Sequence, residues 1–177
     1  MVIWITGLTA SGKTTLGIHL EKNLKLFGIK KILRLDGDEL RSRRKFKNSH
    51  SIDDRWFNLK LIVEIVLEEK IKNEIIIVST VSHISEMRLY ARKKIENFHE
   101  IYLSCNPDIC EARDYKGLYS RAKKNQLEKN EVFPGVTEPY QVTKKPELVL
   151  QTNSETINQS LQRLLSYCES NIKKNLR

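Results

Sequence analysis

One eight-residue segment near the N-terminus limits what this chain can fold into more than any other feature. It reads GLTASGKT over residues 7–14 and fits the pattern G-x-x-x-x-G-K-[ST], in which a glycine-rich loop wraps phosphate groups. The apolar run Val2–Thr6 precedes it, and Lys13–Phe27 follows with apolar residues at helical spacing. A strand, this loop and a helix in that order predict the start of an α/β nucleotide-binding domain. The alternative is a glycine-rich turn with no nucleotide.

The residues of this loop have distinct expected roles. Backbone N–H groups of the curled loop and the positive end of the helix dipole face phosphate oxygens. Lys13 supplies a point charge for the β- and γ-phosphates, and the Thr14 hydroxyl is placed to hold Mg²⁺. We therefore expect an ATP site formed by Gly7, Leu8, Thr9, Ala10, Ser11, Gly12, Lys13, Thr14 and Thr15.

The rest of the chain predicts a parallel sheet covered by helices. Nearly continuous apolar runs rich in β-branched residues are typical of strands buried on both faces, and they alternate here with helical patterns. Further helical stripes lie over Asp53–Lys72 and from Ile157 to Leu165. The expected strands are Val2–Thr6, Ile32–Asp36, Ile75–Ser79, Glu100–Ser104 and Leu148–Gln151. We expect a doubly wound, three-layer α/β/α fold with five parallel strands, formed as one domain over residues 1–177.

The least regular stretch is Lys124–Pro146, which contains Pro134, Gly135 and Pro139. Proline and glycine at this density interrupt helices and strands, so this segment predicts a mobile loop. It falls within a lid that we place at about residues 113–146.

Two aspartates are expected to supply the acidic groups of the site. The apolar strand over residues 74–79 ends in Ser79, so the carboxylate that usually holds the metal there is missing. The residues L-D-G-D at positions 35–38 place carboxylates at i and i+2, which project to the same side of an extended chain. We assign Asp36 to the Mg²⁺ side and Asp38 to the acceptor hydroxyl, as its proton acceptor. The alternative is a solvated Asp-Gly-Asp turn.

Composition narrows the class of protein. The 177 residues carry a net charge of +9, which favours anionic partners without saying which. No apolar run approaches the roughly 20 residues of a membrane span, and no signal-peptide pattern follows Met1, so we expect a cytoplasmic protein. The three cysteines lack metal-binding spacing and are expected to be reduced.

Five short motifs in order resemble the adenylylsulfate kinase family, and the match covers nearly the whole chain. They read GLTASGKTT, LDGDELR, DDR followed by Asn58, EARDYKGLY and KPELVLQT. The resemblance implies a kinase that moves the γ-phosphoryl group of MgATP to the ribose 3′-hydroxyl of adenosine 5′-phosphosulfate. It also implies a P-loop kinase fold that is commonly a homodimer. Sulfate assimilation, supply of a sulfation donor and capsule modification would each fit this chemistry.

The resemblance also implies roles for individual residues. Arg113 would lie beside ATP, and Lys116 would close on the acceptor from the lid. Ser82 matches a serine given in some members as a phosphoserine intermediate; in-line transfer needs no such step, so we treat it as a substrate contact or an ordinary loop serine. The implied acceptor-binding set is Asp38, Arg41, His50, Arg55, Asn58, Val81, Ser82, Lys116 and Phe133.

Departures from the family pattern gather on the acceptor side. His50 stands where the family has a phenylalanine that sandwiches the adenine against a second one, here Phe133. His83 replaces the proline after the loop serine. His50 could stack on a base, donate a hydrogen bond to it, or be an ordinary loop residue. A related kinase of capsule biosynthesis, which acts on cytidine diphosphoramidate, is therefore the alternative function.

Two other classes compete with a kinase. A nucleic-acid-binding P-loop protein is suggested only by the net charge, and the basic clusters lack interleaved aromatic residues, so we expect no nucleic-acid partner. A nucleotide-binding module without turnover would have no need for the four residues Lys13, Thr14, Asp36 and Asp38 together. We expect ATP and an anionic nucleotide as the partners, and no membrane.

Overall fold

A five-stranded parallel sheet forms the centre of the computed structural model, which describes residues 1–175. The strand order is β2-β3-β1-β4-β5, and every neighbouring pair is parallel. The strands are β1 (Val2–Gly7), β2 (Ile32–Asp36), β3 (Ile75–Ser79), β4 (Phe98–Ser104) and β5 (Leu148–Gln151). The order reverses direction at β1, so the crevice beyond the carboxyl ends of β1 and β3 is where a ligand is expected in such sheets.

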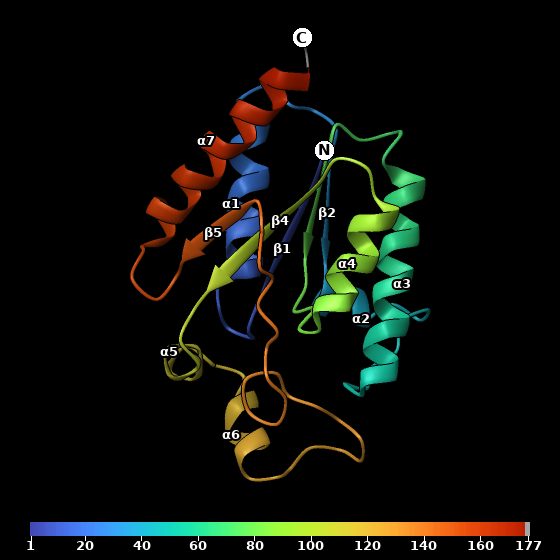
Figure 1. The fold of residues 1–177 in the computed structure, drawn as a ribbon, viewed down its shortest axis with the longest axis vertical. Coiled ribbons are helices and arrows are strands. Elements are labelled where there is room, and N and C mark those ends of the chain that lie inside the picture. Colours follow the sequence, from blue (N-terminus) through green and yellow to red (C-terminus); the bar gives the residue numbers. More distant parts are fainter. Residues whose placement is uncertain (176–177) are drawn as a thin grey trace.

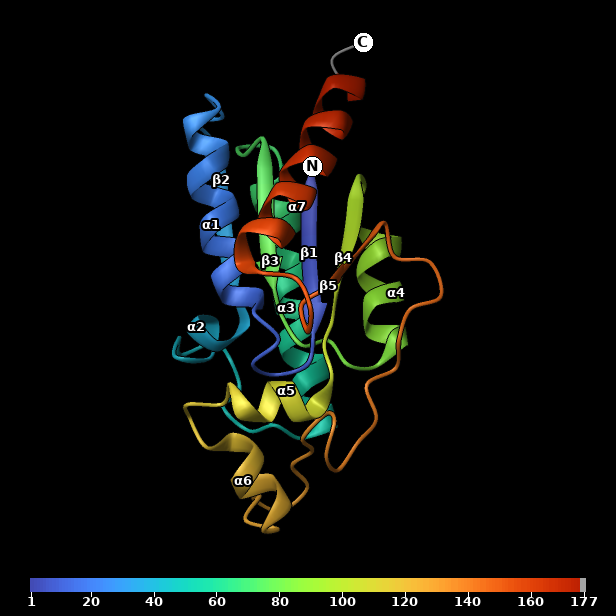
Figure 2. The same ribbon diagram turned by 90° about the vertical axis from the view of Figure 1, so that its left-hand side faces the viewer.

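Helices cover both faces of this sheet. They are α1 (Lys13–Leu26), α2 (Gly37–Arg41), α3 (Ile52–Glu69), α4 (Ser85–Lys94), α5 (Pro107–Ala112), α6 (Leu118–Lys123) and α7 (Ile157–Asn175). Figure 1 shows α1 and α7 on one side of the sheet and α3 and α4 on the other, and in Figure 2 the side of the molecule that carries α1 and α7 faces the viewer. The short helices α2, α5 and α6 lie near the carboxyl ends of the strands (Figures 1 and 2).

Alternate residues of the central strand β1 supply the two main cores. Val2 and Trp4 pack with α3 and α4, whereas Ile3 and Ile5 pack with α1 and α7. This division follows from the two-residue period of a strand, since successive side chains point to opposite faces. All six residues of β1 are buried, which explains why its sequence is apolar without alternation.

A third, smaller core lies beneath the lid. Tyr119 and Ala122 of α6 and Cys110 of α5 pack there with Leu8 of the phosphate-binding loop. Phe133 closes this cluster, and its ring meets the Tyr119 ring edge-on at 4.8 Å between centroids. The lid is therefore packed against the loop that it is expected to cover.

The expected α/β fold with five parallel strands is confirmed. The strands agree with the expected ones to within two residues at each end, and the three predicted helices are present with shifted ends. The lid contains helix α6, whereas most of Lys124–Pro146 is irregular, as its prolines and glycine suggest. Within residues 1–175, no helix is long and apolar enough to span a bilayer.

Candidate active site

The phosphate-binding loop joins the end of β1 to the start of α1. Gly7 and Gly12 have φ angles of 151° and 101°, a region that disfavours residues with a side chain. A Cβ on Gly7 would lie 2.8 Å from the carbonyl oxygen of Leu103 on the neighbouring strand. The two glycines of the motif are therefore required by backbone geometry, which leaves the N–H groups at the start of α1 free to face an anion.

Lys13 is folded back over this loop and is buried. Its Nζ donates a hydrogen bond to the carbonyl oxygen of Leu8 at 2.6 Å. Burial lowers the pKa of Lys13 to about 8, and nearby Asp38 opposes that shift. Among residues 1–175, Lys13 has no carboxylate oxygen within ion-pair distance, and a buried ammonium in that state is costly. A phosphate brought to this position would therefore stabilise its charge.

Thr14 and Asp36 meet at the base of the loop. The Thr14 hydroxyl donates to Oδ2 of Asp36 at 2.7 Å, which brings together the two residues expected on the metal side. Asp36 is 3% exposed and ends β2, so the parallel sheet itself fixes the carboxylate beside the first turn of α1.

The geometry assumed for the two aspartates is wrong in one respect. The chain is not extended at residues 36–38, because helix α2 begins at Gly37. Asp36 caps this helix, and its Oδ1 accepts a hydrogen bond from the backbone N–H of Asp38 at 3.0 Å. Asp38 thus lies in the first turn of α2 with an exposed side chain, while Asp36 is buried. The start of this helix, rather than the alternation of side chains along a strand, therefore determines that one carboxylate is buried and the other is exposed.

The lid reaches the exposed aspartate. Lys116 Nζ lies 3.3 Å from Oδ2 of Asp38, and the carboxylate raises the pKa of Lys116. Gly117 follows with a φ of 68° and is the N-cap residue of α6. Tyr119 donates from its hydroxyl to the carbonyl oxygen of Thr9 at 3.1 Å. The lid therefore contacts both the phosphate-binding loop and the expected acceptor side. Arg113, at the start of the lid, donates a hydrogen bond to Sγ of Cys105.

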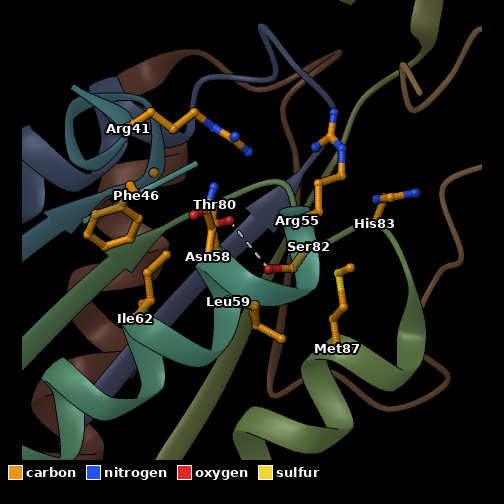
Figure 3. A pocket seen from close by; sticks show the side chains of 11 residues that line it. Arg41, Phe46, Arg55, Asn58, Leu59, Ile62, Thr80, Ser82, His83 and Met87 are labelled. Atoms are coloured by element: carbon orange, nitrogen blue, oxygen red, sulfur yellow. Dashed lines mark hydrogen bonds between the residues drawn. The ribbon is translucent and has the colours of Figure 1, made fainter. Parts of the chain in front are cut away.

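A cavity lies between α2, α3 and the loop after β3, where the acceptor is expected (Figure 3). Its volume is about 30 Å³, roughly a tenth of the smallest pockets that usually hold small ligands, so a nucleotide requires side chains to move apart. It brings together four of the expected acceptor residues, and it lies at the end of the sheet that carries the phosphate-binding loop. Its lining includes Arg41, Arg55, Asn58 and Ser82.

Two arginines give this cavity its charge. Within residues 1–175, neither Arg41 nor Arg55 lies within 4.0 Å of a carboxylate oxygen. Arg41 donates instead to the carbonyl oxygens of Lys47 and Ser49, and Arg55 donates to those of His50 and Val132. Burial, followed by repulsion from Arg41, lowers the pKa of Arg55 to about 10. An anionic ligand would relieve both costs.

Other expected acceptor residues make structural contacts here. The Asn58 amide bonds both the N–H and the carbonyl group of Lys47, so it holds the loop before α3. Val81 accepts a hydrogen bond from the Thr6 hydroxyl at 2.7 Å. Phe133 is packed on Tyr119 within the lid core. A stacking position for Phe133 against a base requires the lid to rearrange.

His50 lies beside the two arginines. Its backbone carbonyl holds Arg55, and its Nδ1 is buried with no hydrogen-bond partner among the described residues. Burial, with Arg41 and Arg55 as further causes, lowers the pKa of His50 to about 4. The ring is therefore neutral near pH 7, with one nitrogen able to donate and the other to accept.

The buried ion pair between Arg88 of α4 and Glu100 of β4 is not indicated by any sequence pattern. Both side chains are 1% exposed, and Arg88 Nε lies 2.9 Å from Glu100 Oε1. Arg88 also donates to the carbonyl oxygens of Ser82 and Gln141, and its guanidinium lies 5.1 Å from the centre of the Tyr140 ring. One side chain thus ties the acceptor loop to the returning end of the lid. Only the burial of this pair, which sequence does not show, distinguishes it from surface charges.

We expect Arg88→Met to lower the free energy of unfolding by about 3–5 kcal/mol, because it leaves the Glu100 carboxylate buried without a cation. Denaturant unfolding measures the change. Lys93→Met, on an exposed position of the same helix, is the control and should change stability by less than about 0.5 kcal/mol. An Arg88 variant as stable as this control would contradict the assigned role of the pair.

The glycine-rich loop, the parallel sheet order and the paired Thr14 and Asp36 define a P-loop phosphotransferase. Among the described residues, no group of three or more His, Cys, Asp or Glu side chains could hold a metal ion, so any metal is held by few protein ligands. Such a site fits a cation that arrives with a nucleotide.

Comparisons with known proteins give the family. The family model described as adenylylsulphate kinase matches residues 1–151. An adenylyl-sulfate kinase of Staphylococcus epidermidis is 35% identical over 94% of this chain and 82% of its own length. One of Pseudomonas aeruginosa is 36% identical over 96% and 86% of the two chains. The chain belongs to the adenylylsulphate kinase family.

A solved structure agrees in fold along nearly the whole chain. The Mycobacterium tuberculosis APS kinase in complex with AMPPNP and APS superposes with a TM-score of 0.84 and 30% sequence identity. The match covers 95% of this chain and 96% of the other. The resemblance stated from the sequence motifs is confirmed at the level of family and fold.

Proposed function

We propose that the protein transfers the γ-phosphoryl group of ATP to the ribose 3′-hydroxyl of adenosine 5′-phosphosulfate. The observation that carries this proposal is the pair of half-buried arginines, Arg41 and Arg55, which line a cavity next to a complete phosphate-binding loop and have no carboxylate oxygen within 4.0 Å among the described residues. A doubly anionic nucleotide is the ligand class that complements two guanidinium groups. Family membership supports the same acceptor.

The donor side is the better defined half of the site. Lys13 and the N–H groups of residues 7–15 would bind the β- and γ-phosphates, with Arg113 beside the nucleotide. Thr14 and Asp36 offer a hydroxyl and a carboxylate oxygen 2.7 Å apart, a hard oxygen pair that fits Mg²⁺. When bound, Mg²⁺ would neutralise charge on the phosphate oxygens. Asp36 is held in place by the N–H of Asp38 and by the Thr14 hydroxyl.

On the acceptor side, each residue has a proposed task. Asp38 takes the proton of the 3′-hydroxyl as that oxygen bonds to the γ-phosphorus. The bond between the γ-phosphorus and the β–γ bridging oxygen breaks, and ADP leaves with its electron pair. Arg41 and Arg55 offset the charge of the phosphosulfate, whereas Lys116 brings a cation from the lid. The φ of Ser82 is 38°, so the backbone turns sharply at this residue. We treat Ser82 as a contact to the acceptor rather than as the site of a covalent intermediate. Asn58 and Val81 support the walls of this pocket.

An ADP-release assay with MgATP tests the proposal. Adenosine 5′-phosphosulfate and cytidine diphosphoramidate are compared as acceptors, and each product is identified by mass and by the position of the new phosphate. We expect faster turnover of the sulfate compound and phosphate on the 3′-oxygen. Preference for the cytidine compound would move the protein to capsule biosynthesis while retaining the kinase chemistry.

One observation favours testing that second acceptor. His50 is neutral, and its Nδ1 is buried without a partner, so it can bond a base edge as readily as stack on a ring. An adenine sandwich would also need Phe133 to leave Tyr119. Cytidine diphosphoramidate therefore remains the second candidate.

We expect His50→Phe to shift acceptor preference toward the adenine nucleotide by about 3- to 10-fold, because a larger aromatic face gains stacking energy of roughly 0.5–1.5 kcal/mol. The ratio of kcat/KM for the two acceptors measures this shift. His19→Phe, at an exposed position on α1, is the control. An unchanged ratio would contradict a base-reading role for position 50.

We further propose that the protein acts in the cytoplasm as a homodimer. The family resemblance supports both statements, and sedimentation at several protein concentrations would measure the state of assembly. Nucleic acid is not among the proposed partners, because the basic clusters of the sequence are not interleaved with the aromatic residues that single-strand binding uses.

A further inference from the structure

His83 is the most unusual side chain of the acceptor cavity. It is 1% exposed, and both ring nitrogens are buried with no hydrogen-bond partner among the described residues. Buried polar atoms of folded proteins are almost always paired, so a residue with two unpaired nitrogens calls for a physical reason. The loop after β3 places His83 next to Ser82 in the lining of the cavity (Figure 3).

The surroundings of this imidazole are positive. Burial lowers the pKa of His83 to about 4, and the guanidinium groups of Arg55 and Arg88 are further causes of this shift. Arg88 is paired with Glu100, whereas among the described residues no carboxylate oxygen lies within 4.0 Å of Arg55, and Glu131 and Asp38 act on it only from farther away. Figure 3 shows the His83 ring on the same side of the cavity as the end of Arg55. A neutral ring beside an unpaired cation can donate its N–H to an anionic oxygen.

The backbone holds the ring in this position. The His83 carbonyl accepts a hydrogen bond from the N–H of Gln141 at 2.9 Å, and Arg88 fixes the carbonyl of Ser82 just before it. Ser82 itself has a φ of 38°, which turns the chain sharply at this point. The imidazole is therefore presented from a constrained loop rather than from a mobile one.

We propose that His83 is a specificity-determining acceptor contact, whose ring N–H hydrogen-bonds an anionic oxygen of the second acidic group on the acceptor's 5′-phosphate. This inference rests on the proposed function and deepens it, because it names the part of the acceptor that the residue reads. The positive charge of Arg55 would offset the negative charge of the same group, whereas the His83 ring would donate a hydrogen bond to one of its oxygens. His50 lies nearer Glu131 and Asp38, so it has a different electrostatic setting and a separate role.

Binding of acceptors with and without the second group tests the proposal. Dissociation constants are measured by calorimetry for adenosine 5′-phosphosulfate and for AMP, with a nonhydrolysable ATP analogue and Mg²⁺ present. We expect His83→Leu to weaken binding of the phosphosulfate about 10-fold or more and to change AMP binding less than twofold, as for loss of a hydrogen bond to a charged group. His83→Asn and His83→Gln place an amide near either ring nitrogen, and one of them should restore most of the affinity.

His99→Leu is the matched control, because His99 lies on β4 with both ring nitrogens already bonded, to Tyr167 and Asn97. It should leave both dissociation constants unchanged. If His83→Leu weakens both ligands equally, or neither, and no amide variant discriminates between them, His83 is a packing residue and the proposal is wrong.

A measurement on the unmodified protein covers the case in which His83→Leu does not fold. The ¹⁵N resonances of the His83 ring, assigned by their loss in His83→Gln, should shift when the phosphosulfate binds and stay in place when AMP binds. Equal shifts with both ligands would overturn the assignment.

Failure of the proposed function gives a different result. If the unmodified protein binds cytidine diphosphoramidate and not adenosine 5′-phosphosulfate, the same comparison is made between that compound and CMP. A His83 effect confined to cytidine diphosphoramidate would then support the inference while rejecting the sulfate acceptor.

Discussion

Lys13→Ala is expected to reduce turnover by at least 100- to 1,000-fold and to weaken ATP binding as well. The Lys13 ammonium is buried at the phosphate-binding loop, and its hydrogen bond to the Leu8 carbonyl oxygen holds it over the loop that we expect to bind the phosphates. Loss of one fixed charge that stabilises a transferring phosphoryl group costs rates of this order. Steady-state kinetics and ATP titration measure the two effects. Lys22→Ala, on an exposed position of α1, is the control and should change neither.

The pH dependence of ATP binding gives a second test of the same residue. Burial lowers the pKa of Lys13 to about 8 in the free protein, so the ammonium loses its proton as the pH rises through that value. Bound phosphates favour the charged form, and ATP affinity should therefore be constant below pH 8 and fall above it. The fall should be absent in Lys13→Ala. An identical pH profile in the two proteins would contradict a phosphate contact by Lys13.

Asp38→Asn is expected to lower kcat by about 100- to 10,000-fold, the usual contribution of a positioned proton acceptor, while ATP affinity changes less than twofold. The amide keeps the size of the side chain but cannot take the proton of the attacking hydroxyl. Since Asp38 is exposed and Asp36 provides the helix cap, the substitution should leave the fold unchanged. Single-turnover kinetics with both substrates bound separates the chemical step from product release.

Glu39→Gln is the matched control for that experiment. Glu39 is the next residue of α2 and bonds Arg34 at 2.9 Å rather than the lid. The variant removes the same charge from the same helix, and turnover should remain within about threefold. If both variants lose activity alike, the cause is the charge of α2, and Asp38 is not the proton acceptor.

Much of the fold follows from local sequence patterns. The strands were predictable because strands buried on both faces, such as β1 and β3, must be apolar throughout. Helices α2, α5 and α6 were not, since five or six residues are too few to show a helical period. Five of the ten residues of helix α4 are charged, and its apolar stripe is short. Its position depends on contacts with α3 rather than on its own pattern.

The candidate site likewise has one part that local sequence motifs predict and another that only the folded chain brings together. The loop residues 7–15 act through backbone geometry that a local motif encodes, and the structure brings Thr14 and Asp36 together as expected. The spatial relation of Asp36 and Asp38 was misjudged, because the start of α2 at Gly37 is a local turn that two flanking acids do not reveal. Arg88 and Glu100 could not be found, since their pairing depends on β4 and α4 packing together. The two unpaired nitrogens of His83 are likewise visible only once the loop is folded.

The position of β1 in the sheet has a consequence for how the chain is made. It is the first strand synthesised, yet it lies at the centre and pairs only with β3 and β4. Its partner Phe98 leaves the ribosome about 95 residues after Val2, roughly 5–20 seconds later at ordinary rates of translation. Both edges of this apolar strand stay open until β3 is made, and the edge that pairs with β4 stays open for the whole interval, because both partners are distant in sequence. The nascent chain therefore carries its greatest risk of misassociation before its fourth strand is complete.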